Sequence, residues 1–291
     1  MRNLLLASVA FVTLSSGAAL AGENDAYILQ VGGGNNSAQE QSGYNGTVAG
    51  AQFGFGNELT QTQEGLYNTA LSLQAGIGNK VEQTQNSSGI LSGGHLATAM
   101  QFGVDNSIKQ TQTGYIQNAL AVQAGFHNFA KQEQAGLGHS AVAFQTGGYN
   151  DAKQDQSGIG HSALAIQVGG GNDAKQDQSG DKGSHEATIL QAGFGNDAKQ
   201  IQSGKDNTAS SVQLGIGNTS KQEQWGSRGE ASVLQVGYEN KAFQEQGGKN
   251  NTAAAVQAGA WNKSYQKQTS QNDNALAIQA GVGNTAHQTQ R

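Results

Sequence analysis

The sequence predicts an all-β fold: a β-solenoid of twelve two-strand coils, about 22 residues each, with the cross-β stacking typical of amyloid. Three observations predict it. One sequence unit recurs twelve times, each unit holds two strand-like runs separated by a glycine-rich turn, and the 291 residues include no proline. Strands in a ladder exclude proline, whereas disordered linkers usually contain it. Composition alone, rich in Gln, Asn, Gly and Ala, would instead indicate a disordered or prion-like chain.

The first 21 residues differ from the rest. Arg2 precedes an apolar run from Leu4 to Leu14, and Ala19 and Ala21 form a small-x-small cleavage site. Residues 1–21 are therefore interpreted as a signal peptide, followed by a repeat domain over residues 22–291. The alternative, a transmembrane anchor, would need a longer apolar run. We expect an exported protein whose stability does not come from disulfides, since the chain contains no cysteine.

The repeated unit is Q-x-G-x-x-N-x-x-x-Q-x-Q. Taking Gln167 as its first position, the same register recurs every 22 residues, except for 27 between Gln74 and Gln101 and 24 between Gln167 and Gln191. Alanine lies four residues upstream in eleven units, with Val48 as the exception. Five positions fixed in twelve units indicate a repeat architecture.

In each unit the two strand-like runs are represented by A-L-A-I-Q-V and D-A-K-Q-D-Q, and G-G-G-N forms the turn between them. Glycine interrupts any helical stripe, which excludes a helical repeat. At about 4.8 Å per coil, twelve coils would form a rod roughly 58 Å long. The extra residues, around Ser87–Gly94 and Asp181–Gly183, both follow the second run, so we expect that arc alone to accommodate loops.

Stacking in register explains why amides recur while aliphatics vary. Identical amides placed one above another can each donate to one neighbouring coil and accept from the other, and a missing rung costs about 1–3 kcal/mol. The predicted structural ladders comprise the opening glutamines Gln30, Gln52, Gln74, Gln101, Gln123, Gln145, Gln167, Gln191, Gln213, Gln235, Gln257 and Gln279; the turn asparagines Asn35, Asn57, Asn79, Asn106, Asn128, Asn150, Asn172, Asn196, Asn218, Asn240, Asn262 and Asn284; and the closing glutamines Gln41, Gln63, Gln85, Gln112, Gln134, Gln156, Gln178, Gln202, Gln224, Gln246, Gln268 and Gln290.

Either of the two faces of the first strand in each unit could point towards the interior. One parity carries Gln167 with small residues, and the other carries Leu164 and Ile166. Burial of large aliphatics would favour the second parity inside. In the second strand, however, the corresponding parity is Asp173 and Lys175, which must face water. We therefore favour buried amides, which leaves an aliphatic stripe outside on one sheet as a lateral contact.

Two further columns contain titratable residues. His139, His161 and His185 share one position in consecutive coils, with His95 two coils earlier. They are either surface substitutes for the asparagine found elsewhere in that column, at Asn68 and Asn207, or a metal or pH site in which protonated rings would repel one another. A second column holds Lys109, Lys131, Lys153, Lys175, Lys199 and Lys221, which we interpret as a solvated face neutralised by Asp151, Asp155, Asp173 and Asp177.

The pattern Q-x-G-x-x-N-x-A-x-x-x-Q closely resembles the curlin repeat of extracellular curli amyloid fibres. Seven of the twelve turns end in Gly-Asn, and the curlin alanine is matched by Ala130, Ala152, Ala174, Ala198, Ala242 and Ala286. The resemblance covers residues 24–291, and the N-T-A, H-S-A and final T-Q-R elements are closer to the minor, nucleator-type curlin. The chain departs from curlins in having more repeats and no short non-repeat leader.

The resemblance implies a structural subunit of a secreted, surface-attached bacterial fibre that mediates adhesion and biofilm formation. Its implied partners are other copies of itself, a nucleator or major curlin, an outer-membrane secretion channel, and host or abiotic surfaces. Independently of the resemblance, neither end of the repeat array has a polar cap, which favours end-to-end polymerisation. The alternative is a soluble β-solenoid adhesin, or a nucleator that does not form the bulk of the fibre.

Other functions receive no support from the sequence. A net charge of −5 without a basic patch argues against nucleic-acid binding. No catalytic set stands out from the repeat, so we expect no enzyme activity and no cofactor. The segment 169–173 is only faintly similar to a calcium-binding nonapeptide, whose nine-residue period is absent, and the threonines are too scattered for an ice-binding face.

Overall fold

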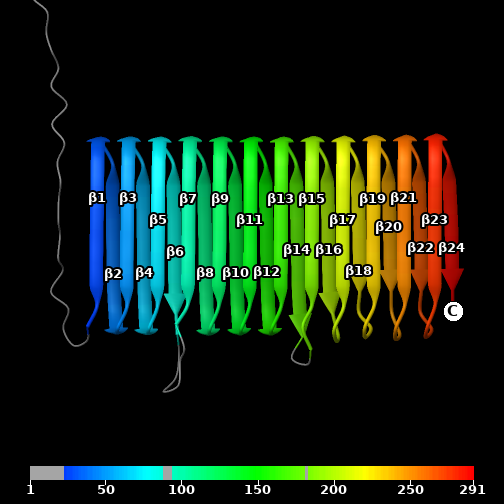
Figure 1. The fold of residues 1–291 in the computed structure, drawn as a ribbon, viewed down its shortest axis with the longest axis horizontal. Coiled ribbons are helices and arrows are strands. Elements are labelled where there is room, and N and C mark those ends of the chain that lie inside the picture. The colour runs from blue at the N-terminus through cyan, green and yellow to red at the C-terminus, as the bar shows by residue number, and fades with distance from the viewer. Residues whose placement is uncertain (1–22, 88–93, 181–182) are drawn as a thin grey trace, which may run out of the picture.

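The computed structural model describes residues 23–87, 94–180 and 183–291, and it confirms the predicted β-solenoid. Two parallel sheets of twelve strands each face one another, and the chain alternates between them, completing one coil with every pair of strands. Figure 1 shows the coils stacked side by side along the long axis of the molecule. The predicted signal peptide, residues 1–21, lies outside the described residues.

The odd-numbered strands form the first sheet, sheet A. They are β1 (Asp25–Gly33), β3 (Thr47–Phe55), β5 (Thr69–Ile77), β7 (Leu96–Val104), β9 (Asn118–Phe126), β11 (Ser140–Gly148), β13 (Ser162–Gly170), β15 (Glu186–Phe194), β17 (Thr208–Ile216), β19 (Glu230–Tyr238), β21 (Thr252–Ala260) and β23 (Asn274–Val282). The even-numbered strands form sheet B. They are β2 (Asn36–Tyr44), β4 (Glu58–Leu66), β6 (Lys80–Asn86), β8 (Ser107–Tyr115), β10 (Phe129–Leu137), β12 (Asp151–Ile159), β14 (Asp173–Gly180), β16 (Asp197–Ser203), β18 (Thr219–Gln224), β20 (Lys241–Gln246), β22 (Lys263–Gln268) and β24 (Thr285–Gln290).

Every strand pairs in the register of the sequence repeat. Gln145 lies opposite Gln167 in sheet A, and the 27-residue spacing leaves Gln74 opposite Gln101. The first arc, along the upper edge in Figure 1, always contains two residues, whereas the second arc contains nine residues after β6 and two to five after the other strands of sheet B, including the five after β14. The inserts therefore lie in the second arc, as predicted, although residues 88–93 and 181–182 within them lie outside the described residues.

The invariant glycine of the first strand is required by close packing between coils. Gly147 has a φ of +113°, and a Cβ atom on it would lie 1.9 Å from the carbonyl oxygen of Gly169 in the next coil. The last glycine of the turn has a different reason. Gly195, in the first arc, has a φ of +62°, and a Cβ atom on it would meet no described atom within 4 Å, so other residues can occupy this position, as Tyr149 does in an earlier coil with a φ of 58°. The first glycine is therefore invariant and the second is only preferred.

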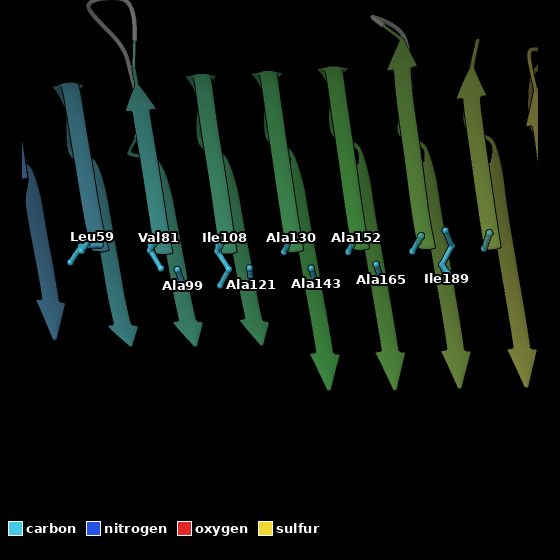
Figure 2. Packing of buried hydrophobic residues seen from close by; sticks show 12 residues of the cluster. Leu59, Val81, Ala99, Ile108, Ala121, Ala130, Ala143, Ala152, Ala165 and Ile189 are labelled. Atoms are coloured by element: carbon cyan, nitrogen blue, oxygen red, sulfur yellow. The ribbon is translucent and has the colours of Figure 1, made fainter. Parts of the chain in front are cut away.

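The alternate residues that include the recurring amides face the interior of the solenoid. Ala163, Ala165 and Gln167 are buried, whereas Leu164 and Ile166 are half-buried on the outer face of sheet A. This confirms the assignment of the aliphatic stripe to the outside. The apolar core is consequently thin: one continuous row of side chains extends from Leu59 to Ala198 (Figure 2), and a second group contains Val233, Ala242 and Ala255.

That core is built from one pair of facing residues per coil, nine positions apart, whose sizes compensate. A Cβ atom on Gly50 would lie 2.2 Å from Cδ2 of Leu59, so the large side chain occupies the space left by glycine. Ala99 accompanies Ile108, and the order reverses where Ile189 accompanies a buried alanine, Ala198. Because the cross-section must stay constant from coil to coil, an increase on one sheet requires a decrease on the other.

We predict that Gly147→Ala destabilises the solenoid much more than Gly195→Ala. Both substitutions place alanine at a positive φ, which costs about 1–2 kcal/mol, but only the first also forces a clash with the next coil. The measurement is the denaturant midpoint of each purified variant. Equal midpoints would contradict the packing reason for the invariant glycine.

Candidate functional site: the stacked amide columns

The opening and closing glutamines form two continuous columns of side-chain hydrogen bonds. In the opening column, each Nε2 donates to the Oε1 of the next coil at 2.6–3.0 Å, from Gln30 through to Gln279. In the closing column, the same bond recurs at 2.7–3.0 Å from Gln41 to Gln290. Away from the terminal coils these side chains are fully buried. Both columns extend across the 27- and 24-residue units without interruption.

The glutamines of these columns also donate from Nε2 to backbone carbonyl oxygens of other strands and arcs. Nε2 of Gln167 donates to the carbonyl oxygens of Asp151 and Asn172, both at 2.9 Å. Nε2 of Gln156 in sheet B donates to the carbonyl oxygen of Ser140 in sheet A at 3.0 Å. A single amide therefore connects neighbouring coils and also the two sheets, which an aliphatic side chain could not do.

The asparagine column runs in the opposite direction. Asn172 donates from its backbone N–H and from Nδ2 to Oδ1 of Asn150, the asparagine of the preceding coil, at 3.2 and 3.0 Å. Nδ2 of Asn172 also lies 3.1 Å from the carbonyl oxygen of Gly193 in the following coil. The side-chain bond recurs from Asn35 to Asn284 at 2.9–3.1 Å. The first arc keeps a constant length because this asparagine bonds to both of its neighbours.

A fourth amide column was absent from the predicted ladders. Its members lie nine residues after the opening glutamine, face inward from sheet B, and bond to one another at 2.7–3.1 Å. They are Gln39, Gln61, Gln83, Gln110, Gln132, Gln154, Gln176, Gln200, Gln222, Gln244, Gln266 and Gln288. The signal was present in the sequence, since this glutamine recurs in all twelve units and shares the inward parity of the closing glutamine.

The histidine column corrects one interpretation from the sequence. His95, His139, His161 and His185 are fully buried and are not surface residues. The rings of His139 and His161 stack with centroids 5.1 Å apart, and those of His161 and His185 with centroids 4.7 Å apart. Asn207 continues the same column and is equally buried.

Histidine is accepted inside because its two ring nitrogens reproduce the bonds of asparagine. The backbone N–H of His161 donates to Nδ1 of His139 at 3.2 Å, and Nε2 of His139 lies 3.1 Å from the carbonyl oxygen of Ala135. In Asn207, Oδ1 accepts from the backbone N–H of Gly229, and Nδ2 donates to the carbonyl oxygen of Ser203. Nδ1 must accept and Nε2–H must donate, so the column requires neutral imidazole in one tautomer.

Burial lowers the pKa of the imidazoles of His95, His139 and His185. Loss of contact with water is the largest cause of the lowered pKa of His95, His139 and His185, and the charge of His161 lowers the pKa of His139 and His185 further. Repulsion between stacked rings, the cause expected from the sequence, is thus secondary to desolvation. A proton on Nδ1 would also abolish the acceptor that the next coil uses.

Gln117 occupies the same column and fits it less well. Its Nε2 donates to the carbonyl oxygens of Thr113 and Gly136, but its Oε1 is buried and has no hydrogen-bond partner in the part of the chain that the structure describes. The extra methylene moves this oxygen away from the position where Asn and His accept. The column therefore selects residues by the distance from Cα to the acceptor, in addition to their polarity.

The outer face of sheet B carries the charged residues. The six stacked lysines lie in register, and ion pairs join Lys153 to Asp151 at 2.6 Å and Lys131 to Glu133 at 2.8 Å. Lys109 bonds to Glu82 of the preceding coil at 2.9 Å. These groups are partly exposed, as predicted for a solvated face, and such pairs contribute little to stability.

No known protein-family profile matches this chain, and no curated protein matches it in sequence. In residues 23–87, 94–180 and 183–291, no three or more His, Cys, Asp or Glu side chains are grouped so as to hold a metal ion. The same residues contain no helix long and apolar enough to cross a membrane. What distinguishes the described chain chemically is its set of stacked polar columns.

We predict that replacing Gln213 and Gln224 together with leucine lowers the free energy of unfolding by several kcal/mol. Each substitution removes one rung and leaves amides in both neighbouring coils unpaired, at about 1–3 kcal/mol for each unpaired group. The control replaces Lys221 and Glu223 with leucine, which removes only a partly exposed ion pair worth about 0–1 kcal/mol. Equal shifts in denaturant midpoint would argue that the amides are not the main interaction between coils.

We predict that the protein loses stability as the pH falls below about 6.5, and that replacing His139, His161 and His185 with asparagine removes much of this loss. A cationic group whose pKa is lowered by folding binds more protons when unfolded, so acid favours the unfolded chain. Asparagine is the matched replacement because the column already accepts it. Thermal midpoints between pH 7 and pH 5 provide the measurement.

Wild type and variant must be compared at each pH, because carboxylates titrate nearby with the opposite sign. Burial raises the pKa of Asp155, Asp173 and Asp197, so their protonation stabilises the folded state towards acid. Asp206 raises the pKa of His185 and partly opposes desolvation there. Superimposable pH profiles for the two proteins would contradict a role for the histidine column.

Proposed function

We propose that this protein is a structural subunit of an extracellular, curli-like amyloid fibre that polymerises by end-to-end stacking of its coils. The observation that carries the proposal is the equivalence of successive coils. Every internal coil donates from its glutamines to the following coil and from its asparagine to the preceding one. The two faces of any coil are therefore complementary to each other, and a coil of a second copy satisfies the same bonds.

The first described coil supports this reading. Oε1 of Gln39 is buried and has no hydrogen-bond partner among the described residues. In each later coil the equivalent oxygen accepts from the preceding glutamine, as Gln61 does from Gln39 at 2.7 Å. At the other end, Nε2 of Gln288 bonds to the backbone at Leu276, and the next glutamine acceptor would belong to a further coil. The acceptor on the first described coil and the donor on the last one thus match.

Adhesion and biofilm formation enter the proposal through the resemblance of the repeat to curlins. Long parallel sheets with unpaired edges, held by amide ladders, are also the general physical basis of amyloid growth. A fibre of this kind would need copies of itself for growth, with a nucleator, a secretion channel and adhesion surfaces as further partners.

The test is assembly of the purified chain, followed by thioflavin-T fluorescence, electron microscopy and fibre diffraction. We expect unbranched fibres with a reflection at about 4.8 Å along the fibre axis, and seeds that abolish the lag phase. Replacing Gln279, Gln288 and Gln290 with leucine should slow elongation at least tenfold, because these donors face the incoming copy.

The matched control replaces Thr285, His287 and Thr289 of the same coil with valine, since these three side chains point outward. It should elongate at the rate of the wild type. A wild-type protein that stays monomeric and folded at every concentration would instead support the soluble adhesin and contradict the proposal.

A further inference from the structure

The outer face of sheet A is apolar along its whole length, and we propose that it pairs with the same face of a second copy of this chain. Two solenoids would then lie side by side with their A sheets in contact. Such lateral pairing does not require end-to-end growth.

The charge distribution between the two sheets is the first argument. The twelve strands of sheet A contain no Lys, Arg or His, and their only charged residues are Asp25, Glu186 and Glu230, each at the first position of a strand. The four outward columns that follow in each strand are uncharged in every coil. By contrast, almost every strand of sheet B has at least one charged residue on its outer face. A single exposed rod would gain nothing from this separation.

The apolar side chains on sheet A are incompletely covered in a single solenoid. Phe53, Phe102, Val168 and Val236 lie in one outward column and are each about 40–50% exposed, with values of 39%, 41%, 48% and 41%. Neighbouring coils cover only the two sides of these side chains that face along the solenoid axis. Patches of this kind on a folded protein indicate an interaction surface.

The face has the relief needed for specific packing. Ala49 and Ala51 lie beside the larger Leu71, Leu73 and Met100, and together they border a shallow hollow. Outward residues vary in size along the stack because only the inner columns are fixed, as in the column of Phe53, Ala75, Phe102 and Ala124. A second sheet with the same rise per coil can place its large side chains over such hollows along the full length.

The available area is sufficient for a stable pair. The uncharged columns cover about 20 Å by about 53 Å, on the order of 1,000 Å² on each partner, if twelve rungs are spaced at about 4.8 Å. Specific interfaces bury about 800 Å² per partner. The near-absence of twist between successive strands in Figure 1 allows two such faces to stay in contact from end to end.

The chemistry favours a second copy over a lipid surface. Proteins that lie on membranes combine an apolar face with flanking Lys and Arg, which bind anionic headgroups. The strands of sheet A contain no Lys or Arg, and their three charged residues are acidic. A second copy of sheet A requires no charge on either side.

The test replaces Val122, Ile166 and Val212 with lysine, three outward, half-buried side chains of β9, β13 and β17. Mass per length is measured by scanning transmission electron microscopy for polymers, and molar mass by light scattering for unpolymerised protein. We expect the wild type to have twice the mass of the variant in whichever state forms. Failure to polymerise would affect the proposed function, whereas the twofold ratio tests pairing alone.

Two further variants keep the result interpretable. Replacing Thr111, Ser157 and Thr219 of sheet B with lysine adds the same charge to the other face and should leave the mass doubled. Threonine at positions 122, 166 and 212 retains β-propensity and should also lower the paired fraction, so a folding defect of the lysine variant does not decide the outcome. A wild type with the mass of a single solenoid, or equal halving by the sheet B variant, would overturn the proposal. So would a single solenoid that binds neutral phosphatidylcholine vesicles through sheet A.

Discussion

The hydrogen bond between a buried amide and the same amide of the next coil is the interaction on which the rest of this structure depends. A glutamine such as Gln167 has its Oε1 and Nε2 occupied by neighbouring coils and by the backbone across the solenoid. Since these bonds are directional, they fix both the register and the distance between coils. Burial without them would cost a few kcal/mol per amide, so partial stacking is unfavourable. The composition follows from this requirement, because the amides fill positions that aliphatic side chains occupy in most cores.

This use of amides changes where the aliphatic residues go. Only one small apolar pair per coil is needed inside, as with Leu59 facing Gly50 or Ile189 accompanying Ala198. The larger aliphatics of sheet A, such as Leu164 and Ile166, are left on the outside. The solenoid consequently has one apolar and one charged face around a polar interior. The usual relation between hydrophobicity and burial is therefore inverted in sheet A.

Most of the fold could be predicted from the sequence because a strict repeat states which residues are equivalent. Twelve units with a constant first arc leave two strands per coil as the simplest arrangement, and Asp173 and Lys175 of sheet B determine which parity faces water. At the histidines, the positions of the hydrogen-bonding atoms indicate burial better than the polarity of the side chain does. His161 is polar, which suggested the surface, but its ring nitrogens match the acceptor and donor of asparagine: Nδ1 accepts from the backbone N–H of His185, and Nε2 bonds to the carbonyl oxygen of Ser157. The size compensation between Gly50 and Leu59 depends on which residues face each other across the interior, and no single strand reveals that.

Protection of side-chain amide protons from hydrogen exchange, measured by NMR on the folded protein, tests the central claim most directly. The account predicts that the Nε2 protons of buried column glutamines, such as Gln145, Gln154 and Gln156, exchange orders of magnitude more slowly than those of Gln271, which is exposed. Exchange should accelerate only when neighbouring coils separate, because each proton is held between two coils or between the two sheets. Exchange of the column glutamines at the rate of Gln271 would contradict the account.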